Sequence, residues 1–566
     1  MSLQEVEESL ESTEQNNSFF EKAVRLLGLP ACKAFLRDGQ VMPVNFVPYG
    51  GVVTTPARQT VARLFPKTLA GATLMLAADG ANPRPRPGLR VAALFSGGPA
   101  SGGHNVIVGL KRILKGNTLL GVRGGPAGLL AGDLFEIQDG DLPRLANTGG
   151  FDFLGTDRTR IRTKEQLGLV ENICLKHSLD AIVIIGGDDS NTNAVTLAEH
   201  LFSVYPDGKG VQVIGVPKTM DGDLQYGHHL PVSFGFDTAT KVYSELVGNI
   251  LQDTLSSRKY WHFIRLMGRT ASHVTLEVAL QTKPTVTLIA EELSWQRRTL
   301  RSVVDEISHA VITRSASGKD YGVVLVPEGL LEAIPEVGEL LEQIDIAIAR
   351  HAADIAAMPL DQRARLIAEQ LDADKSALFR SLPGYMQETL VADRDAHGNL
   401  RVSQIQTEIL LGDLVTARVA ELSSDTPLAI NHHFFGYEGR CGVPTRFDAA
   451  FCYNLGLTAG SLVLDGRTGY MASVTDLDKG GVPVAIPLPG MLHEEERDGK
   501  TEVVIQKALV TQSSPAFRFF AARREQWMRD DRISSPGPRQ LWGTSADQLP
   551  FTVALNQGYD SLRFRF

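Results

Sequence analysis

The chain has 566 residues, of which 43% are hydrophobic and 21% are charged, and its formal net charge is -9 at pH 7. This length and composition are typical of a soluble protein with more than one domain and a large apolar core. The acidic balance argues against a general nucleic-acid binder, which requires a basic face, so no nucleic-acid partner is expected.

Residues 1–90 are expected to form an N-terminal extension before the main fold. Met1–Asn17 is acidic and polar and does not resemble a signal peptide. Asp79–Arg90 carries three prolines and few apolar residues, which indicates a linker. The four cysteines form no C-x-x-C pair, and no uninterrupted apolar run is long enough to span a bilayer. These features predict a cytoplasmic protein without a membrane partner.

A regular alternation of strands and helices begins at residue 91. Short apolar runs rich in β-branched residues predict buried strands, and segments with helical spacing follow them. The predicted strands are Val91–Phe95, Ala181–Ile185, Val211–Val216, Tyr260–Leu266, Val286–Ala290 and Tyr321–Val326. The predicted helices are His104–Leu114, Asn191–Val204, Thr238–Leu251 and Thr270–Gln281. Two such series predict an α/β protein with two doubly wound, Rossmann-like lobes and an active-site cleft between them.

The element order predicts how the chain divides. Residues 331–400 are rich in Leu, Ala, Glu, Asp and Arg at helical spacing, which predicts a helical insertion. The other expected parts are a first lobe at 91–245 with a return at about 440–500, a second lobe at 246–330 and 400–440, and a C-terminal segment at 500–566.

Two polar loops directly follow predicted strands, Gly186–Ser190 after one and Pro217–Asp223 after the next. Together they offer glycines, four carboxylates, a lysine and a threonine. In open α/β sheets, ligands bind at the carboxyl ends of the strands. The residue types suit phosphoryl transfer, in which backbone amides and lysine bind phosphate, carboxylates hold Mg²⁺, and one carboxylate deprotonates a hydroxyl.

Each loop also has a purely structural explanation. The glycine-rich turn Phe95–Asn105 could bind an anion through its backbone N–H groups or could be a tight turn. One of Asp188 and Asp189 could cap the following helix, although capping does not explain the second carboxylate. Pro217–Asp223 could be a solvated turn with an internal ion pair. The coincidence of these loops at neighbouring strand ends favours the functional interpretation.

Three later motifs add groups that bind sugar phosphates. Arginine suits bidentate contact with phosphate, and a carboxylate suits sugar hydroxyls. The motifs are Met267-Gly268-Arg269, Pro327-Glu328-Gly329 and Gly436-Tyr437-Glu438-Gly439-Arg440.

In their order along the chain, the motifs resemble those of the phosphofructokinase family. The chain is most similar to the long, pyrophosphate-dependent members of that family, and the resemblance covers roughly residues 90 to 470. The GGD loop alone is less specific, because NAD kinases and lipid kinases carry a similar one. The motifs are FSGGPASGGHN, GGDDSN, PKTMDGDL, MGR, PEG and GYEGR.

The resemblance implies the reversible, Mg²⁺-dependent transfer of a phosphoryl group from pyrophosphate to the 1-hydroxyl of fructose 6-phosphate. Asp221 would be the base, supported by Asp223, and Asp188 would hold Mg²⁺. The first lobe would bind the donor through Gly97, Gly98, Arg158, Asp189 and Lys218. The transferring phosphoryl group would contact Lys218, Thr219 and Arg440. The second lobe would hold fructose 6-phosphate through Met267, Gly268, Arg269, Glu328, Tyr437 and Arg440, with Lys259 reaching the site of a neighbouring subunit.

Two residues bear on the choice of donor. The resemblance places Asp189 and Lys218 where ATP-dependent bacterial relatives carry glycine. The Asp189 side chain would crowd and repel the α-phosphate of a nucleotide, whereas Lys218 adds a cation where pyrophosphate ends. Both features favour pyrophosphate. The alternatives are an ATP-dependent phosphofructokinase and a non-catalytic regulatory subunit, and the family suggests a homo-oligomer, either a dimer or a tetramer.

Overall fold

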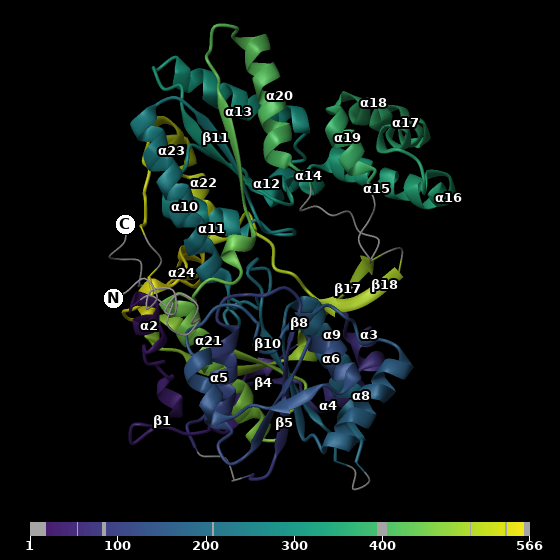
Figure 1. Cartoon of the computed structure of the whole chain (residues 1–566), viewed down its shortest axis with the longest axis vertical. Helices are drawn as coiled ribbons and strands as arrows, with labels where there is room; N and C mark the ends of the chain where they lie inside the picture. The colour runs from purple at the N-terminus through teal and green to yellow at the C-terminus, as the bar shows by residue number, and fades with distance from the viewer. Residues whose placement is uncertain are drawn as a thin grey trace, which may run out of the picture.

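The computed structural model spans the chain and describes residues 19–559 except for 54, 82–85, 206–208, 393–404, 498–499 and 538–539. Figure 1 shows two α/β lobes, one below the other, with a group of helices beside the upper lobe. Several sequence predictions fall wholly or partly outside the described residues. These include Met1–Asn17, the middle of the linker at 82–85, the end of the insertion and the start of the next segment at 393–404, and the end of the C-terminal segment at 560–566.

The lower lobe contains a sheet with ten strands among the described residues. Its central strands β15, β10, β9, β5 and β6 are parallel, and antiparallel strands extend both edges. In sheet order the strands are β3 (Phe46–Val52), β4 (Leu74–Ala78), β16 (Val482–Pro487), β15 (Tyr470–Thr475), β10 (Gln212–Pro217), β9 (Ala181–Gly186), β5 (Arg90–Ser96), β6 (Thr118–Val122) and β7 (Leu134–Glu136), with β8 (Thr156–Asp157) paired to β5.

Distant parts of the sequence complete this sheet. The segment predicted as an N-terminal extension contributes β3 and β4, and β4 pairs with β16. The chain returns from the upper lobe to add β15 beside β10. Part of the predicted extension therefore belongs to the lower sheet. The proline-rich linker that follows it suggested instead a segment separate from the main fold.

Both faces of the lower sheet are covered because successive residues of the buried strands point to opposite sides. Along β5, Val91 and Phe95 pack in one core with residues of α5 and α21, whereas Ala92 and Leu94 pack in another with residues of α8 and α9. These helices are α5 (Gly103–Ile113), α21 (Arg446–Leu464), α8 (Lys164–His177) and α9 (Asp188–His200). Among the described residues, α21 alone has the length and composition to cross a membrane, and its apolar window is wholly buried within the fold.

The upper lobe contains a parallel sheet of four strands. In sheet order they are β12 (Val286–Thr287), β13 (Gly322–Pro327), β11 (Trp261–Leu266) and β14 (Ile430–Phe435). The helices around it are α10 (Phe236–Ser257), α11 (His273–Thr282), α12 (Ala290–Trp295), α13 (Leu300–Ser315), α20 (Thr407–Leu422) and, from the C-terminal segment, α22 (Pro515–Ala521), α23 (Arg524–Asp530) and α24 (Phe551–Gln557).

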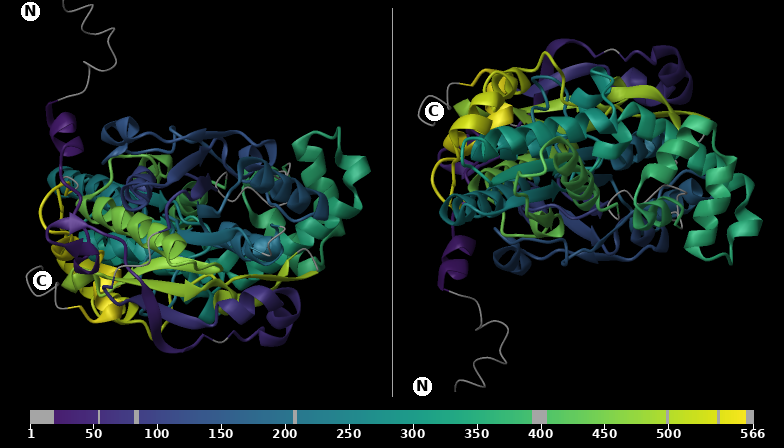
Figure 2. Two further views of the ribbon diagram at one scale, coloured as in Figure 1. Left: turned by 90° about the horizontal axis from the view of Figure 1, so that it is seen from below. Right: turned by 90° about the horizontal axis from the view of Figure 1, so that it is seen from above.

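The predicted insertion is helical and projects to one side of the molecule in all views (Figures 1 and 2). Its helices share an apolar core with strands and helices of the upper lobe, including Trp261, Phe263 and Val326. They are α14 (Leu330–Ala333), α15 (Pro335–Arg350), α16 (Ala352–Ile355), α17 (Leu360–Gln370), α18 (Ala373–Ser381) and α19 (Gly384–Leu390). The hairpin β17 (Leu492–Arg497) and β18 (Lys500–Ile505) lies below them, against α9.

The predicted strands and helices are confirmed, with two differences that matter. The run Val286–Ala290 forms only the short β12, and Ala290 begins α12, because a short apolar run does not distinguish a strand from a buried helix. Helix α9 begins at Asp188 rather than Asn191, so both aspartates lie in its first turn, where the helix dipole favours negative charge.

Helices α5 and α21 approach closely through facing glycines, and each follows a predicted site loop. A Cβ on Gly456 would lie 2.2 Å from the Val106 carbonyl oxygen and 3.0 Å from the Gly109 Cα. The helix pair therefore fixes the loop before α5 against the loop before α21.

We predict that Gly456→Ala lowers the free energy of unfolding by about 1–3 kcal/mol, because the added methyl group forces the two backbones apart. Gly168→Ala is the matched control. Gly168 also lies inside a helix, but a Cβ at this position would have nothing within 4 Å, so alanine should stabilise the protein by about 0.5–1 kcal/mol. Chemical denaturation measures both changes, and equal stability of the two variants would contradict the close packing of α5 on α21.

Candidate functional site

The loops at the carboxyl ends of the parallel strands in both lobes converge. Gly98 follows β5 of the lower lobe, and Arg440 follows β14 of the upper lobe. A Cβ on Gly98 would lie 3.3 Å from Arg440 Nη1 and 3.6 Å from Arg158 Nη2. The glycine thus lets two guanidinium groups approach the backbone, and these sequence-predicted residues lie together.

Lys218 is the central cation of the lower lobe. It follows β10, its side chain is only 6% exposed, and its Nζ donates a hydrogen bond of 2.8 Å to the Gly98 carbonyl oxygen. A Cβ on Gly97 would lie 3.2 Å from this Nζ. The amine therefore lies directly beneath the glycine-rich loop that was predicted to bind the donor.

Burial lowers the pKa of Lys218 to about 8. This value is the net result of burial and of nearby charges, because the carboxylates of Asp221 and Asp188 raise the pKa, whereas Arg440 and Arg158 lower it. Lys218 is thus close enough to interact electrostatically with four other predicted site residues, namely Asp188, Asp221, Arg158 and Arg440. An anion bound here would stabilise the charged form of the lysine.

Asp188 is the first residue of α9, and the preceding Gly187 occupies the N-cap position without a side-chain cap. The Oδ2 atom of Asp188 is buried without a hydrogen-bond partner, and the nearest cation recorded for this atom is Lys507 Nζ at 3.8 Å. Capping therefore does not explain this carboxylate. Mg²⁺ is commonly bound by one or two carboxylates together with substrate phosphates, so the unpartnered oxygen fits a magnesium ligand.

Asp189 forms an ion pair that sequence analysis missed. Its Oδ2 lies 2.9 Å from Arg160 Nη2, and the two side chains are 45% and 35% exposed. Arg160 follows β8 and therefore borders the same strand ends. The pair holds the Asp189 carboxylate in the first turn of α9, beside these strand ends, although an ion pair this exposed to solvent adds little to stability.

Asp221 and Asp223 differ in exposure. Asp221 is half-buried, and its backbone N–H donates to Thr219 Oγ1 over 3.1 Å. Asp223 is 7% exposed, and burial raises its pKa to about 7, with the charges of Asp221 and Asp188 acting in the same direction. The accessible carboxylate is thus Asp221, while Asp223 holds a proton through part of the neutral pH range.

The upper lobe contributes a buried carboxylate beside a loop that contains a glycine with positive φ. Gly268 follows β11 with φ +145°, and its N–H donates to Glu328 Oε2 over 3.0 Å. The other oxygen, Oε1, is buried without a hydrogen-bond partner. Burial raises the pKa of Glu328, and the charge of Asp221 raises it further, while Arg265 and Arg269 lower it. A carboxylate with an open acceptor at this edge suits a sugar hydroxyl.

Arg440 and Tyr437 form the other side of the upper-lobe site. The Arg440 guanidinium lies 4.8 Å from the centroid of the Tyr437 ring, and the Arg440 Nε is buried without a hydrogen-bond partner. Tyr437 is 68% exposed, so it can contact a ligand. Met267 is buried near this loop, where a Cβ on Gly436 would lie 3.0 Å from its Cε.

Lys507 is a second cation that sequence analysis missed. Its Nζ lies 3.8 Å from Asp188 Oδ2 in the lower lobe and 3.2 Å from Thr270 Oγ1 in the upper lobe. The next residue, Ala508, donates its N–H to the Asp223 carbonyl oxygen over 2.7 Å. The C-terminal segment therefore contacts both lobes at the site. Lys507 could not be predicted because it belongs to no recognisable motif and lies far along the sequence from the other site residues.

Lys259 is the one predicted site residue that the fold does not bring to the carboxyl ends of the parallel strands. It is exposed and precedes β11, whereas Gly268 and Arg269 follow the carboxyl end of that strand. The length of β11 thus separates Lys259 from the other predicted residues of its own chain.

The sequence profile described as "Phosphofructokinase" matches residues 90–463. The chain belongs to the phosphofructokinase family. It is 46% identical to the pyrophosphate–fructose 6-phosphate 1-phosphotransferase of Treponema pallidum over 84% of each chain. It is 41% identical to the β1 subunit and 36% identical to the α2 subunit of the Arabidopsis thaliana enzyme of that name, over 88% and 86% of this chain. These relatives thus match most of the chain.

A solved structure shows the fold as well. The Pichia pastoris phosphofructokinase in its T-state superposes with a TM-score of 0.50 over 85% of this chain and 40% of its own, at 16% sequence identity. This agreement concerns the fold alone, and it is consistent with the two parallel-sheet lobes described above.

The lowered pKa of Lys218 gives a pH prediction. The ammonium group is charged below about pH 8 and loses its charge above it, so kcat/KM for pyrophosphate, which reports the free enzyme, should fall as pH rises through 8. Lys218→Arg keeps a positive charge at every accessible pH and should shift this decline upward. Ionisation of pyrophosphate itself is common to both proteins and cancels in the comparison. Superimposable pH profiles would contradict a pyrophosphate-binding role for the lysine.

Proposed function

We propose that this protein transfers a phosphoryl group reversibly from pyrophosphate to the 1-hydroxyl of fructose 6-phosphate. The products are fructose 1,6-bisphosphate and phosphate. The observation that carries this proposal is the buried Lys218 amine beneath Gly97 and Gly98, with Asp188 and Asp221 close by. The names of relatives that are 41–46% identical over most of the chain support it.

In the proposed mechanism, Asp221 accepts the proton of the sugar 1-hydroxyl. The oxygen forms a bond to the near phosphorus of pyrophosphate while the bridging P–O bond breaks and phosphate leaves. Asp223 supports the base because burial raises its pKa and so favours its neutral form, which limits the negative charge beside Asp221. Lys218, Thr219 and Arg440 would position the transferring group and offset its charge.

The carboxylate of Asp188 would hold Mg²⁺. The cation would neutralise negative charge on the pyrophosphate when bound. The residues fit this ion because Asp188 Oδ2 is a buried acceptor without a hydrogen-bond partner at the start of α9. Arg158 and the backbone of Gly97 and Gly98 would contact the donor beside it.

Fructose 6-phosphate would bind to the upper-lobe loops. Arg269 would bind its phosphate, Arg440 would contact the sugar near the transferring group, and Glu328 would accept hydrogen bonds from the sugar hydroxyls. Met267, Gly268 and Tyr437 would shape the pocket. Lys259 is too far along β11 to serve its own site, so its proposed contact requires a second copy of the chain, and we propose a homo-oligomer on that basis.

Donor selectivity follows from the lower lobe. Arg160 pairs with the Asp189 carboxylate in the first turn of α9, and this carboxylate would repel the α-phosphate of a nucleotide. Lys218 supplies a cation in place of that phosphate. The pair of side chains thus favours the shorter donor by both repulsion and attraction.

The direct test is formation of fructose 1,6-bisphosphate from fructose 6-phosphate and Mg²⁺, measured in parallel with pyrophosphate and with ATP. We predict turnover with pyrophosphate and none with ATP in the wild type. Asp221→Asn keeps the shape of the base but cannot take the proton, so kcat should fall about 10²–10⁴-fold with little change in fructose 6-phosphate affinity. Undiminished turnover of Asp221→Asn would disprove its role as base, and turnover with ATP alone would overturn the donor assignment.

A second prediction concerns the donor. The double variant Asp189→Gly/Lys218→Gly should gain measurable phosphoryl transfer from ATP and lose affinity for pyrophosphate. Arg160→Met is the matched control, since it releases Asp189 but leaves its charge in place, and it should admit ATP less well than the double variant. A folded double variant that still rejects ATP would show that other residues exclude the nucleotide.

A further inference from the structure

The segment that carries Lys507 passes from one lobe to the other. It follows β18, which packs against α9 of the lower lobe, and it leads to α22, which packs against α11 of the upper lobe (Figure 1). The sequence indicates no role for this lysine, and the mechanism proposed above does not use it. Its contacts with both lobes nevertheless place it among the groups of the proposed reaction site.

Hydrogen bonds fix the backbone of this segment to both lobes. The Ala508 N–H donates to the Asp223 carbonyl oxygen of the lower lobe over 2.7 Å. In the upper lobe, His273 Nε2 donates to the Ala508 carbonyl oxygen over 3.0 Å, and the Val510 N–H donates to Glu291 Oε1 over 2.9 Å. The side chains of His273 and Glu291 are buried. The lysine is thus attached to a backbone whose position is set by buried groups.

The ammonium group of Lys507 has hydrogen-bond donors available for a ligand. Its Nζ donates to Thr270 Oγ1 of the upper lobe over 3.2 Å, and it lies 3.8 Å from Asp188 Oδ2 of the lower lobe. The second distance is too long for a hydrogen bond. Among the described residues, Thr270 therefore engages one of the three N–H donors of the ammonium group. The side chain is 29% exposed, so a ligand between the lobes can reach the other two.

The neighbours of Lys507 indicate which part of the substrates it meets. Thr270 directly follows Arg269, the proposed ligand of the sugar phosphate, and Asp188 is the proposed Mg²⁺ ligand on the donor. Lys218 lies instead beneath the glycine-rich loop of the lower lobe. Lys507 therefore approaches from the side of the sugar, at the end of the donor where the phosphoryl group is transferred.

The charge of Lys507 also acts on nearby carboxyl groups. Burial raises the pKa of Asp223 to about 7 and raises the pKa of Glu332, and the charge of Lys507 opposes both effects. A cation that already interacts with carboxyl groups of both lobes is preorganised to offset the charge of a phosphoryl group placed between them.

From these contacts we infer that Lys507 is a further catalytic residue, whose ammonium group donates hydrogen bonds to the transferring phosphoryl group from the side of the upper lobe. The inference rests on the proposed function. The lysine forms no covalent bond, so the bonds made and broken are those of the transfer described above. Negative charge is spread over the oxygens of the phosphoryl group during transfer, and a fixed cation beside them lowers the barrier.

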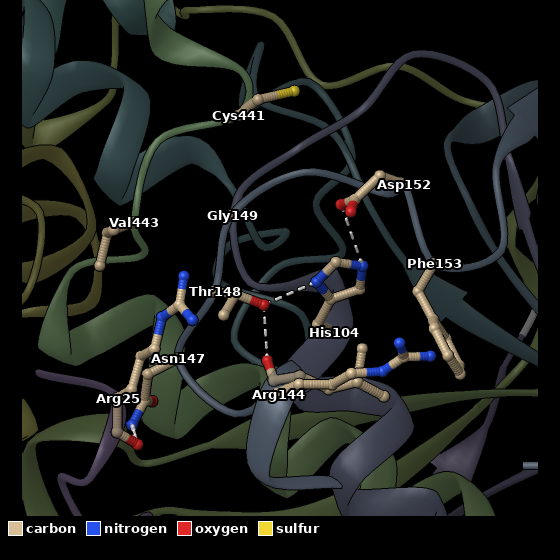
Figure 3. A pocket seen from close by; sticks show the side chains of 11 residues that line it. Arg25, His104, Arg144, Asn147, Thr148, Gly149, Asp152, Phe153, Cys441 and Val443 are labelled. Carbon is tan, nitrogen blue, oxygen red and sulfur yellow. Dashed lines mark hydrogen bonds and ion pairs between the residues drawn. The ribbon is translucent and has the colours of Figure 1, made fainter. Parts of the chain in front are cut away.

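A cavity elsewhere in the molecule is separate from this contact. It has a volume of about 540 Å³ and lies between the loop at 144–153 and the segment that contains Cys441 and Val443 (Figure 3). Neither Lys507 nor the residues that contact it line this cavity. A ligand that touches Lys507 therefore lies in the reaction site between the lobes.

Titration calorimetry with fructose 1,6-bisphosphate and fructose 6-phosphate tests the contact, because the two ligands differ only in the 1-phosphate. Lys507→Met keeps the aliphatic stem and removes the charge. The affinity of this variant for the bisphosphate should fall about tenfold, with less than about a twofold change for the monophosphate. Lys507→Arg keeps the charge and should restore part of the affinity. Lys115→Met is the matched control, since Lys115 is exposed beyond the far end of α5, and it should change neither affinity.

Turnover measures the same contact during the reaction. In Lys507→Met, kcat with pyrophosphate should fall about 10²–10³-fold while the KM for fructose 6-phosphate stays near the wild-type value. A purely structural role would weaken both sugar phosphates equally, and that result overturns the inference. An unchanged affinity for the bisphosphate overturns it as well.

Methylenediphosphonate, a pyrophosphate analogue that cannot transfer its phosphoryl group, separates this inference from the proposed function. In the presence of Mg²⁺, its affinity should also fall about tenfold in Lys507→Met. If the wild type shows no turnover, the proposed function fails, and the analogue still decides the role of the lysine. Equal affinity of the wild type and Lys507→Met for the analogue overturns the inference, and absence of binding of all three ligands overturns both.

Discussion

Parallel pairing of strands is the constraint on which the site depends, because it brings the carboxyl ends of separate strands to one edge. In the lower sheet, β5, β9 and β10 pair in register so that Ser96, Gly186 and Pro217 end side by side. The upper sheet does the same with β11, β13 and β14. Loops that are far apart in the sequence thereby lie next to one another, which the local secondary-structure propensity of each loop does not determine.

The arrangement concentrates charges that would be unfavourable in isolation. A buried lysine and buried carboxylates each resist ionisation, as the lowered pKa of Lys218 and the raised pKa of Asp223 record. Unpartnered atoms remain on Asp188, Glu328 and Arg440, which come from both lobes. Groups left unsatisfied at a shared edge are a common feature of sites that a ligand and a cation complete. The lobes hold these groups in place through packing elsewhere, notably between α5 and α21.

Much of this was predictable because the information is local. β-Branched runs predict the buried strands. The glycine-rich and polar loops directly after these strands indicate Lys218, Asp188 and Asp221 as candidate site residues. What could not be predicted depends on long-range placement. Arg160 and Lys507 carry no motif and reach the site through β8 and the C-terminal segment. Likewise, β3 and β4 look like an appendage until pairing with β16 shows that they complete a sheet, and the distance of Lys259 from its own site depends on strand direction.

In the proposed reaction, the lower lobe holds the phosphoryl donor while the upper lobe presents the sugar to Asp221. A crystal structure of the Asp221→Asn variant with fructose 6-phosphate, pyrophosphate and Mg²⁺ tests it most directly, because slow turnover allows the ligands to remain together. We expect the sugar 1-hydroxyl within about 2.6–3.2 Å of the residue 221 side chain and pyrophosphate in contact with Lys218. Pyrophosphate bound away from Lys218, or a sugar held away from residue 221, would contradict it.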